Sequence, residues 1–497
     1  MMCLILLLAD SMAIFSNDAK HSRFASLGDS FYAYAPIESL ADPVLASVNQ
    51  QTTDFLNLDE SLLSSDTLVK ILAGQGEQKD GIASVYSGHQ FGVYNPQLGD
   101  GRAVIIGEQI AHDGTLWELQ LKGSGKTPFS RFGDGKAVLR SSIREYLACE
   151  AMHALGIAST RAIALVASST PVYREREETA ACLLRSAPSH IRFGHFEYFF
   201  YTHQHTQLTQ LADFVIEQYF PDIAQCDKSL RYGLWFEEVV KRTAKLIAQW
   251  QAVGFCHGVL NTDNMSILGL SIDYGPYLFL DAFKPNMITN RSDHQGRYTF
   301  RQQIPIGLWN LNALAQALSP LLSREQMQAS LLLYQPLVIT HYRELLLNKL
   351  GLQASDEKED DALIGELLDI LAKEAADYSY FFRQLSERDA EHCHRLADDF
   401  IDAPRFLQWL ALYQLRIAQQ VGGDMQRMQT MQQSNPKYVL RNYFAEQAIE
   451  KAQTGNFTYL NDLLCAVQSP FTVEERFAHF AELPPQSSEN IVLSCSS

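Results

Sequence analysis

The chain has 497 residues, of which 46% are hydrophobic, and carries a formal net charge of −17. This length buries a large core and predicts two or three domains or one bilobal unit. An acidic chain without a basic footprint argues against nucleic acid or an anionic membrane as a partner.

The N-terminus contains a short apolar run, Cys3 to Ala9, that ends at Asp10. No Lys or Arg precedes the run, and it is far too short to cross a bilayer, so we interpret it as neither a signal peptide nor an anchor. Met12 is an alternative start, which would make residues 1–11 a start-site artefact. Eight dispersed cysteines without a Cys-x-x-Cys pair favour a reducing compartment, and a cytoplasmic location is expected.

The first half of the chain reads as a β-rich lobe behind a lead-in over residues 1–80. Apolar runs bounded by turn residues predict strands, and Leu139, Ile143, Leu147 and Ala151 recur every four residues as in a helix. Gly156 is expected to close that helix. The predicted strands lie at 102–108, 117–122, 162–166 and 181–185.

The second half reads as helical. Helices are predicted at 208–219 and 234–253, and two short strands at 266–268 and 277–280. Residues 305–480 follow as amphipathic helices, interrupted by an acidic loop at 356–361. The predicted class is therefore α+β, with a bilobal protein-kinase-like (pseudokinase) plan and additional C-terminal helices. Its expected segments after the lead-in are a β-rich N-lobe at 81–205, a catalytic C-lobe core at 206–310 and a helical region at 311–497.

The stretch from His257 to Gly275 carries the strongest chemical signal. It is built like the metal-binding half of a kinase site, with a His-led loop, an Asn, a short apolar segment and Asp-Tyr-Gly. Asn264 and Asp273 fit the two metal positions, because Mg²⁺ and Mn²⁺ prefer carboxylate and amide oxygens.

The catalytic base of this motif is displaced. Small-molecule kinases of this pattern usually keep the catalytic Asp two residues after the histidine, and that position holds Val259. Asp263 stands four residues later. An Asx-turn or a cap is the alternative role for Asp263, and a turn between two strands is the alternative for Asp273.

Lys122 and Glu145 reproduce another kinase feature. Lys122 ends a predicted strand and Glu145 follows 23 residues later on the predicted helix, the order in which a kinase Lys reaches phosphates and a Glu orients it. The alternative is an ordinary surface Lys and Glu.

Two glycine turns flank these residues. Gly99, Gly101 and Arg102 belong to a Gly-Asp-Gly-Arg turn that offers backbone N–H groups and a planar guanidinium to phosphates. A tight hairpin is its alternative role. Asp134 and Gly135 belong to a second turn, where Asp134 fits the N-cap of the following helix and a nucleotide contact, two roles that are compatible.

Arg185 and Arg192 lie in apolar surroundings, where a guanidinium is costly to bury unless an anion meets it. A triphosphate and local acidic side chains are both open as that anion.

These motifs resemble the selenoprotein O family, protein adenylyltransferases of pseudokinase fold, in a bacterial form with cysteine. The resemblance runs from about Phe31 to the C-terminus. It is densest in Tyr86-Ser-Gly-His-Gln-Phe-Gly, Leu98-Gly-Asp-Gly-Arg, Leu121-Lys-Gly-Ser-Gly, Leu139-Arg-Ser-Ser-Ile-Arg-Glu, Pro188-Ser-His-Ile-Arg-Phe-Gly, the stretch from His257, Ser292-Asp-His-Gln-Gly-Arg-Tyr and Asn435-Pro-Lys-Tyr-Val-Leu-Arg-Asn.

The resemblance implies that ATP binds inverted relative to kinases, and that AMP passes to Ser, Thr or Tyr hydroxyls of target proteins while pyrophosphate leaves. Asp263 would accept the proton, Asn264 and Asp273 would bind Mg²⁺ or Mn²⁺, and Glu145 would pair with Lys122. The implied ATP-binding residues are Gly99, Gly101, Arg102, Lys122, Asp134, Gly135, Arg185, Arg192 and Asp273.

The resemblance also implies a redox residue near the C-terminus, here Cys495. The position where some bacterial members keep a partner cysteine holds Thr289, so this chain departs from the pattern of an analogous regulatory disulfide. Cys256, beside the motif, is a candidate substitute partner. A terminal thiol in contact with a substrate protein is the alternative.

Three other functions stay open. Transfer of UMP from UTP is one, because no base-reading residue is identifiable. A true kinase is disfavoured by Val259. A non-catalytic ATP-binding scaffold leaves the Lys-Glu pair, the base and the metal residues unexplained.

Overall fold

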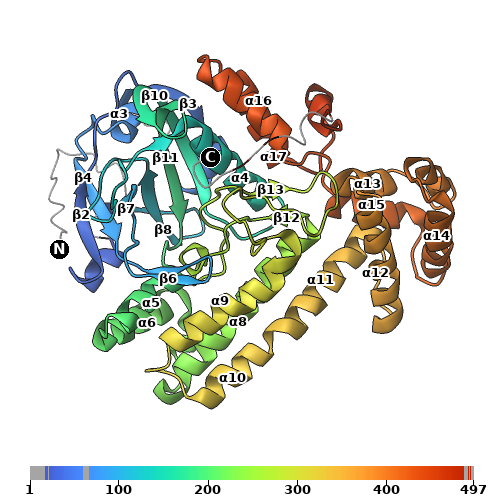
Figure 1. The fold of residues 1–497 in the computed structure, drawn as a ribbon, viewed down its shortest axis with the longest axis horizontal. Coiled ribbons are helices and arrows are strands. Elements are labelled where there is room, and N and C mark those ends of the chain that lie inside the picture. The colour runs from blue at the N-terminus through green and yellow to red at the C-terminus, as the bar shows by residue number, and fades with distance from the viewer. Residues whose placement is uncertain are drawn as a thin grey trace, which may run out of the picture.

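The computed structural model describes residues 17–18, 20, 22–59, 66–485, 491 and 493. In these residues the N-terminal part of the chain forms a nine-stranded sheet in which every pairing is antiparallel (Figure 1). Its main strand order is β2-β4-β7-β8-β11-β10-β3, and β1 and β9 pair with β7 and β11. The strands are β1 Asn17–Asp18, β2 Tyr32–Pro36, β3 Val44–Val48, β4 Asp80–Ser84, β7 Ala103–Ile110, β8 Leu116–Lys122, β9 Ala137–Val138, β10 Arg161–Tyr173 and β11 Glu177–Ala187.

Two smaller sheets have two strands each. The first pairs β5 (Gly88–Gln90) with β6 (Val93–Asn95), and the second pairs β12 (Phe255–Cys256) with β13 (Leu278–Phe279). β5 contacts the turn that carries Asp263, and β12 ends directly before the loop that leads to this turn.

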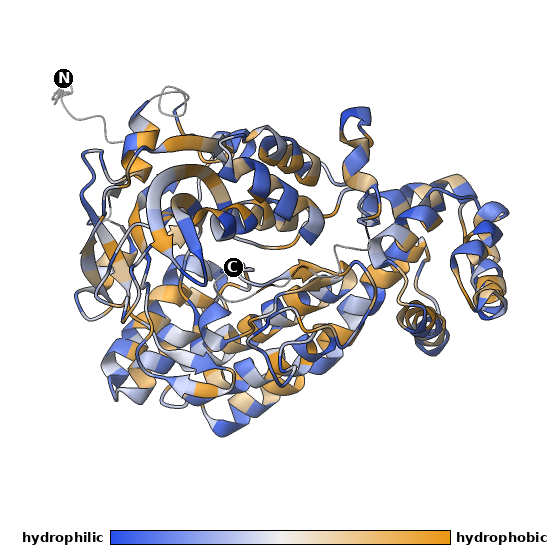
Figure 2. Ribbon diagram, turned by 45° about the horizontal axis from the view of Figure 1, so that its top comes forward, coloured by the Kyte–Doolittle hydropathy of each residue, from blue (hydrophilic) through white to orange (hydrophobic). Residues whose placement is uncertain are grey.

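The large sheet is covered on both faces because its central strands alternate apolar residues to both sides. On β7, Ile105 packs into the cluster that contains the helix residue Ile143. Its neighbours Val104 and Ile106 pack into a separate cluster with Leu68. Such alternation follows from the two-residue repeat of a strand. Figure 2 shows the helices in mixed blue and orange bands, typical of helices with one buried face.

Helices make up most of the chain after β11. The last two, α16 and α17, return to pack against α4, whereas α12–α15 gather at the end of the molecule far from the sheet (Figure 1). The helices are α1 Gln50–Phe55, α3 Asp66–Leu72, α4 Leu139–Ala154, α5 Phe193–Tyr201, α6 His205–Tyr219, α7 Pro221–Ala224, α8 Lys228–Ala252, α9 Gln303–Ala317, α10 Arg324–Leu332, α11 Tyr334–Leu350, α12 Glu357–Lys373, α13 Tyr378–Ser386, α14 Ala403–Ala418, α15 Asp424–Ser434, α16 Asn442–Gln453 and α17 Thr458–Gln468.

The expected α+β class is confirmed, while the kinase-like plan and the four segment boundaries stay predictions. Residues 1–80, expected as a lead-in, supply β2 and β3 and the start of β4, all of which belong to the large sheet. Among the described residues no helix combines the length and apolar character needed to cross a bilayer.

Two local predictions are wrong. Residues 266–268 form no strand, because the chain makes a single bridge from Ser266 to Arg192 and then turns at Gly269, whose φ is +74°. The strand that pairs with β13 is β12. The acidic stretch 356–361 is no loop, because the Asp356 carboxylate accepts hydrogen bonds from Lys358 N and Glu359 N and so caps α12.

Candidate active site

A cavity of about 470 Å³ lies where the sheet, α4 and the loop after β12 meet. This size is ordinary for a nucleotide or other small ligand. Twelve residues predicted from the sequence all line it: Gly99, Gly101, Arg102, Lys122, Asp134, Gly135, Glu145, Arg185, Arg192, Asp263, Asn264 and Asp273.

The cavity has the opposite charge to the chain as a whole. Seven Lys and Arg side chains and five Asp and Glu side chains line it, although the chain carries a net charge of −17. A concave cationic surface in an acidic protein concentrates anionic ligands.

Lys122 and Glu145 form a buried ion pair, not a pair of surface side chains. Lys122 Nζ lies 2.6 Å from Glu145 Oε2, and the two residues are 8% and 3% exposed. Glu145 is buried although it lies off the apolar stripe, because α4 is enclosed between the sheet on one side and α16 and α17 on the other.

Asp273 is the point where the cations of the cavity meet. Lys122 Nζ and Arg185 Nη1 lie 2.8 and 2.6 Å from Asp273 Oδ1, and Arg192 Nη1 donates to Oδ2. Burial opposes ionisation, but Arg192, Lys122 and Arg185 together hold the pKa of Asp273 well below its usual range. The residue has a positive φ of 58°, which is uncommon for a non-glycine residue and concentrates at functional sites.

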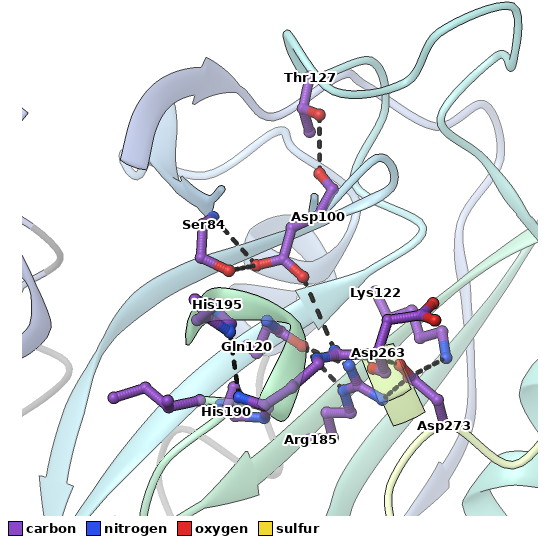
Figure 3. A network of polar contacts seen from close by, with 12 residues as sticks. Ser84, Asp100, Gln120, Lys122, Thr127, Arg185, His190, His195, Asp263 and Asp273 are labelled. Atoms are coloured by element: carbon purple, nitrogen blue, oxygen red, sulfur yellow. Dashed lines mark hydrogen bonds and ion pairs between the residues drawn. The ribbon is translucent and has the colours of Figure 1, made fainter. Parts of the chain in front are cut away.

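Hydrogen bonds and ion pairs to neighbouring residues fix the two arginine side chains, as Figure 3 shows for Arg185. Arg185 Nε and Nη2 donate to Gln120 Oε1 at 2.9 and 2.6 Å. Arg192 Nη1 donates to the Asp263 carbonyl at 3.0 Å, and its Nη2 lies 3.8 Å from Asp100 Oδ1. Asp100 is fixed in turn by Ser84. Both guanidiniums therefore meet local acids in this structure and also border the cavity.

Asp263 lies in the 3₁₀ turn η3 (Thr262–Asn264) and is 8% exposed. Burial raises the pKa of its carboxyl to about 6, and the hydrogen bond from Gln90 and the charge of Arg192 oppose this shift. A carboxylate with a pKa near neutrality suits a proton acceptor.

Asn264 and Asp273 supply a donor set that fits a hard divalent cation. Asn264 Nδ2 donates to the Val259 carbonyl at 2.9 Å, which fixes the amide and leaves its carbonyl oxygen for another partner. Both residues border the cavity. An amide oxygen and a carboxylate oxygen are ligands that Mg²⁺ and Mn²⁺ accept, with water and phosphate oxygens completing the shell.

Only glycine fits at two positions of the glycine turns, because the backbone has a positive φ there and neighbouring atoms lie too close for a Cβ. Gly99 has a φ of +106°, and a Cβ there would lie 2.6 Å from the Phe129 ring. Gly135 has a φ of +71°, and a Cβ would lie 2.1 Å from the Gly125 carbonyl oxygen. The N-cap role considered for Asp134 is wrong, since α4 begins only at Leu139. Its carboxylate instead accepts from Lys136 N at 3.0 Å and from both terminal nitrogens of Arg174 at 2.8 Å.

Arg102 differs from the other cavity cations, because it is exposed and forms no ion pair within the part of the chain that the structure describes. The redox residue Cys495 lies outside the described residues. Its suggested partner Cys256 is fully buried, its Sγ donates to the Tyr298 carbonyl at 3.4 Å, and burial raises its thiol pKa to about 12.

Several residues at the site were not singled out from the sequence. Gln90 reaches Asp263, Asp100 and Gln120 support the arginines, and Tyr86 lies under Arg192 with 5.0 Å between its ring centroid and the guanidinium. Tyr86, Gln90 and Asp100 fall inside the motif strings quoted above. Gln120 had no sequence signal of its own.

Known proteins match this chain over nearly its full length. A family model described as protein adenylyltransferase SelO matches residues 15–468. The protein nucleotidyltransferase YdiU of Pseudomonas paraeruginosa (strain DSM 24068 / PA7) is 49% identical over 479 residues, which cover 96% of this chain and 98% of the relative. The protein of the same name from Vibrio cholerae serotype O1 is 47% identical over 483 residues, with the same two coverages. The chain thus belongs to the SelO family of protein adenylyltransferases.

Proposed function

We propose that this nucleotidyltransferase moves AMP from ATP to a Ser, Thr or Tyr hydroxyl of a target protein. One observation carries the proposal: Lys122, Arg185 and Arg192 converge on Asp273 inside a cationic cavity that also holds the buried Asp263. Such an arrangement suits binding of a polyphosphate by the cationic side chains, with a proton acceptor beside it.

The position of the arginines supports an inverted nucleotide. Arg185 and Arg192 are only 1% and 2% exposed and lie deep in the cavity, whereas Arg102 is at the exposed margin. The deepest donors therefore suit the terminal phosphates of ATP, as the family resemblance implies. The α-phosphate is then the group nearest the acceptor hydroxyl.

The proposed reaction is a direct displacement at the α-phosphorus of ATP. The acceptor hydroxyl oxygen forms a bond to the α-phosphorus, the bond between that phosphorus and the α–β bridging oxygen breaks, and pyrophosphate leaves with the bond's electrons. Asp263 takes the hydroxyl proton. Lys122 and the two arginines stabilise the charge that develops on the phosphates.

The proposed metal ligands are Asn264 and Asp273. A bound Mg²⁺ or Mn²⁺ would neutralise phosphate charge at the reacting group. In this structure the Asp273 carboxylate is occupied by three side-chain cations. We expect those cations to turn to the phosphates when the nucleotide enters, since their positive charge is then matched by the ligand.

The test separates AMP transfer from its rivals. The protein is incubated with a generic acceptor protein, Mg²⁺ or Mn²⁺, and ATP labelled on either the α or the γ phosphate. We expect covalent α-label that is lost in Asp273→Ala. Transfer of the γ-label alone would establish a kinase, retained ATP binding without transfer would establish a scaffold, and preferred transfer from α-labelled UTP would establish UMP transfer.

A further inference from the structure

The hairpin of β5 and β6 lies against the turn that carries Asp263. Its first strand, β5, belongs to the Tyr86–Gly92 motif, which the proposed chemistry does not use. β5 contacts both η3 and α5, so the hairpin is wedged beside the proposed proton acceptor.

The backbone on both sides of Gln90 is anchored to the Asp263 loop. His89 N donates to Thr262 Oγ1 at 2.7 Å. Phe91 N donates to Asn261 Oδ1 at 3.2 Å and to the Tyr298 hydroxyl at 2.9 Å. The residues before and after Gln90 are therefore bound to the two residues that precede Asp263.

A buried carboxylate reinforces the first anchor. Glu197 accepts from the Thr262 hydroxyl at 2.5 Å, and its other oxygen lies 2.6 Å from His89 Nδ1. The two segments approach so closely that a Cβ at Gly88 would lie 3.0 Å from both Cβ and Oδ1 of Asp263. The hairpin and the loop thus form one packed unit.

Gln90 makes the direct contact with the proton acceptor. Its Nε2 donates to Asp263 Oδ2 at 3.0 Å, while Asn95 Nδ2 approaches its Oε1 at 3.5 Å. The other carboxylate oxygen, Asp263 Oδ1, has no hydrogen-bond partner among the described residues. Oδ1 is buried next to Gly88, so the Gln90 amide holds the carboxylate through its other oxygen, Oδ2.

We propose that Gln90 is a positioning residue for AMP transfer, one that fixes the carboxylate of Asp263 in the orientation in which it accepts the proton of the acceptor hydroxyl. This inference rests on the proposed function, in which Asp263 accepts that proton. Gln90 acts through Asp263. A carboxylate without this hydrogen bond is free to rotate about its terminal torsion, which is a broad one, and so spends less time in the reactive geometry.

The first test compares the effect of a Gln90 substitution on kcat with its effect on ATP binding. Gln90→Ala is expected to lower kcat about 10-fold or more while the Kd and KM for ATP change less than about twofold, because only the transition state loses an interaction. Gln97→Ala is the matched control. Gln97 is an exposed glutamine just after β6 whose backbone amide donates to Asn95 Oδ1, so its truncation should leave kcat unchanged. Equal losses in ATP affinity and kcat in Gln90→Ala would overturn the positioning role.

The second test is a double-mutant cycle with Asp263→Ala. If Gln90 acts through Asp263, adding Gln90→Ala to Asp263→Ala lowers the residual transfer rate no further, whereas independent roles give multiplicative losses. The same cycle on the urea unfolding midpoint reports the contact without any activity. Additive midpoint shifts overturn the contact. A wild type that transfers no label refutes the proposed function and the positioning role with it, and the unfolding cycle still decides separately whether the contact exists.

Discussion

Asp263 and Asp273 lie close together but have opposite electrostatic environments. Asp273 is surrounded by cations that depress its pKa, whereas burial raises the pKa of Asp263 to about 6. In the proposed function, the first carboxylate stays ionised for a metal cation and the second stays basic enough to take a proton. This division follows from which charged side chains reach each residue.

Replacing Asp263 with Ala should separate binding from chemistry. We expect ATP affinity within about threefold of wild type and a loss of transfer of about 10²–10⁴-fold, the usual contribution of a general base. The Asp263 side chain contacts Gln90, and Arg192 bonds to Asp263 through the backbone carbonyl, which the substitution keeps. ATP titration and transfer of α-label measure the two quantities. Matched losses of affinity and transfer would remove the role as base.

Arg192→Lys tests the geometry of the proposed phosphate contact while keeping the positive charge of the side chain. A lysine supplies one compact ammonium where Arg192 contacts Asp273 and the Asp263 carbonyl and stacks on Tyr86. We expect a loss of about 1–3 kcal/mol in unfolding free energy, because buried acceptors lose their donors. ATP affinity should fall about 10-fold as a bidentate contact is lost. Urea unfolding and ATP titration are the measurements, and Arg102→Lys at the exposed margin should leave stability unchanged.

At the scale of elements, local sequence patterns predicted the positions of helices and strands well, but they did not predict contacts between residues far apart in the sequence. The four-residue repeat placed α4 correctly, and the order of strand and helix placed Lys122 near Glu145. Contacts such as Gln90 with Asp263, 173 residues apart, leave no local periodic trace. β10 and β11 extend to Tyr173 and from Glu177, beyond their predicted bounds, because the strand ends pair with each other although they include polar residues such as Glu177 and Glu178. A polar strand end therefore looks like a loop in the sequence.

Helix α11 contains a buried lysine that makes stability depend on pH. Lys349 is 4% exposed, lies 4.5 Å from the centroid of the Phe382 ring and has no carboxylate partner in the described part of the chain. Burial lowers its pKa from 10.5 to about 7. Between these values the unfolded chain binds a proton that the folded chain does not, so the free energy of unfolding should rise with pH from about 7 to 10.5.

Lys349→Met should remove this pH dependence. Below about pH 7 the folded protein carries a buried ammonium, so we expect the variant to be more stable than wild type there by about 1–3 kcal/mol. The difference should shrink as pH rises, because the neutral amine is cheaper to bury. Urea unfolding at pH 6, 7.5 and 9 measures it. Lys373→Met on α12 is the control, since that side chain is 65% exposed and its change should have no such slope.

At the scale of the whole molecule, an acidic protein encloses a cationic cavity. The net charge of −17 repels free nucleotides at long range, while the seven cations of the cavity attract them at short range. In the proposed function, the affinity for ATP is therefore the balance of a weak distant repulsion and a strong local attraction. Salt screens exposed charges over roughly 10 Å at 0.1 M, and it weakens contacts between a mobile anion and a partly open cavity.

Raising NaCl from about 50 to about 500 mM should therefore weaken ATP binding by about 3–10-fold, because the Debye length falls below the width of the site. Adenosine, which lacks phosphates, should bind with the same affinity at both salt concentrations. In Arg185→Gln the salt dependence should flatten, since one of the buried donors at the centre of the cavity is lost. Titrations of each ligand at several salt concentrations measure the slopes. A steep slope for adenosine, or an unchanged slope in Arg185→Gln, would show that the cations of this cavity do not meet the phosphates.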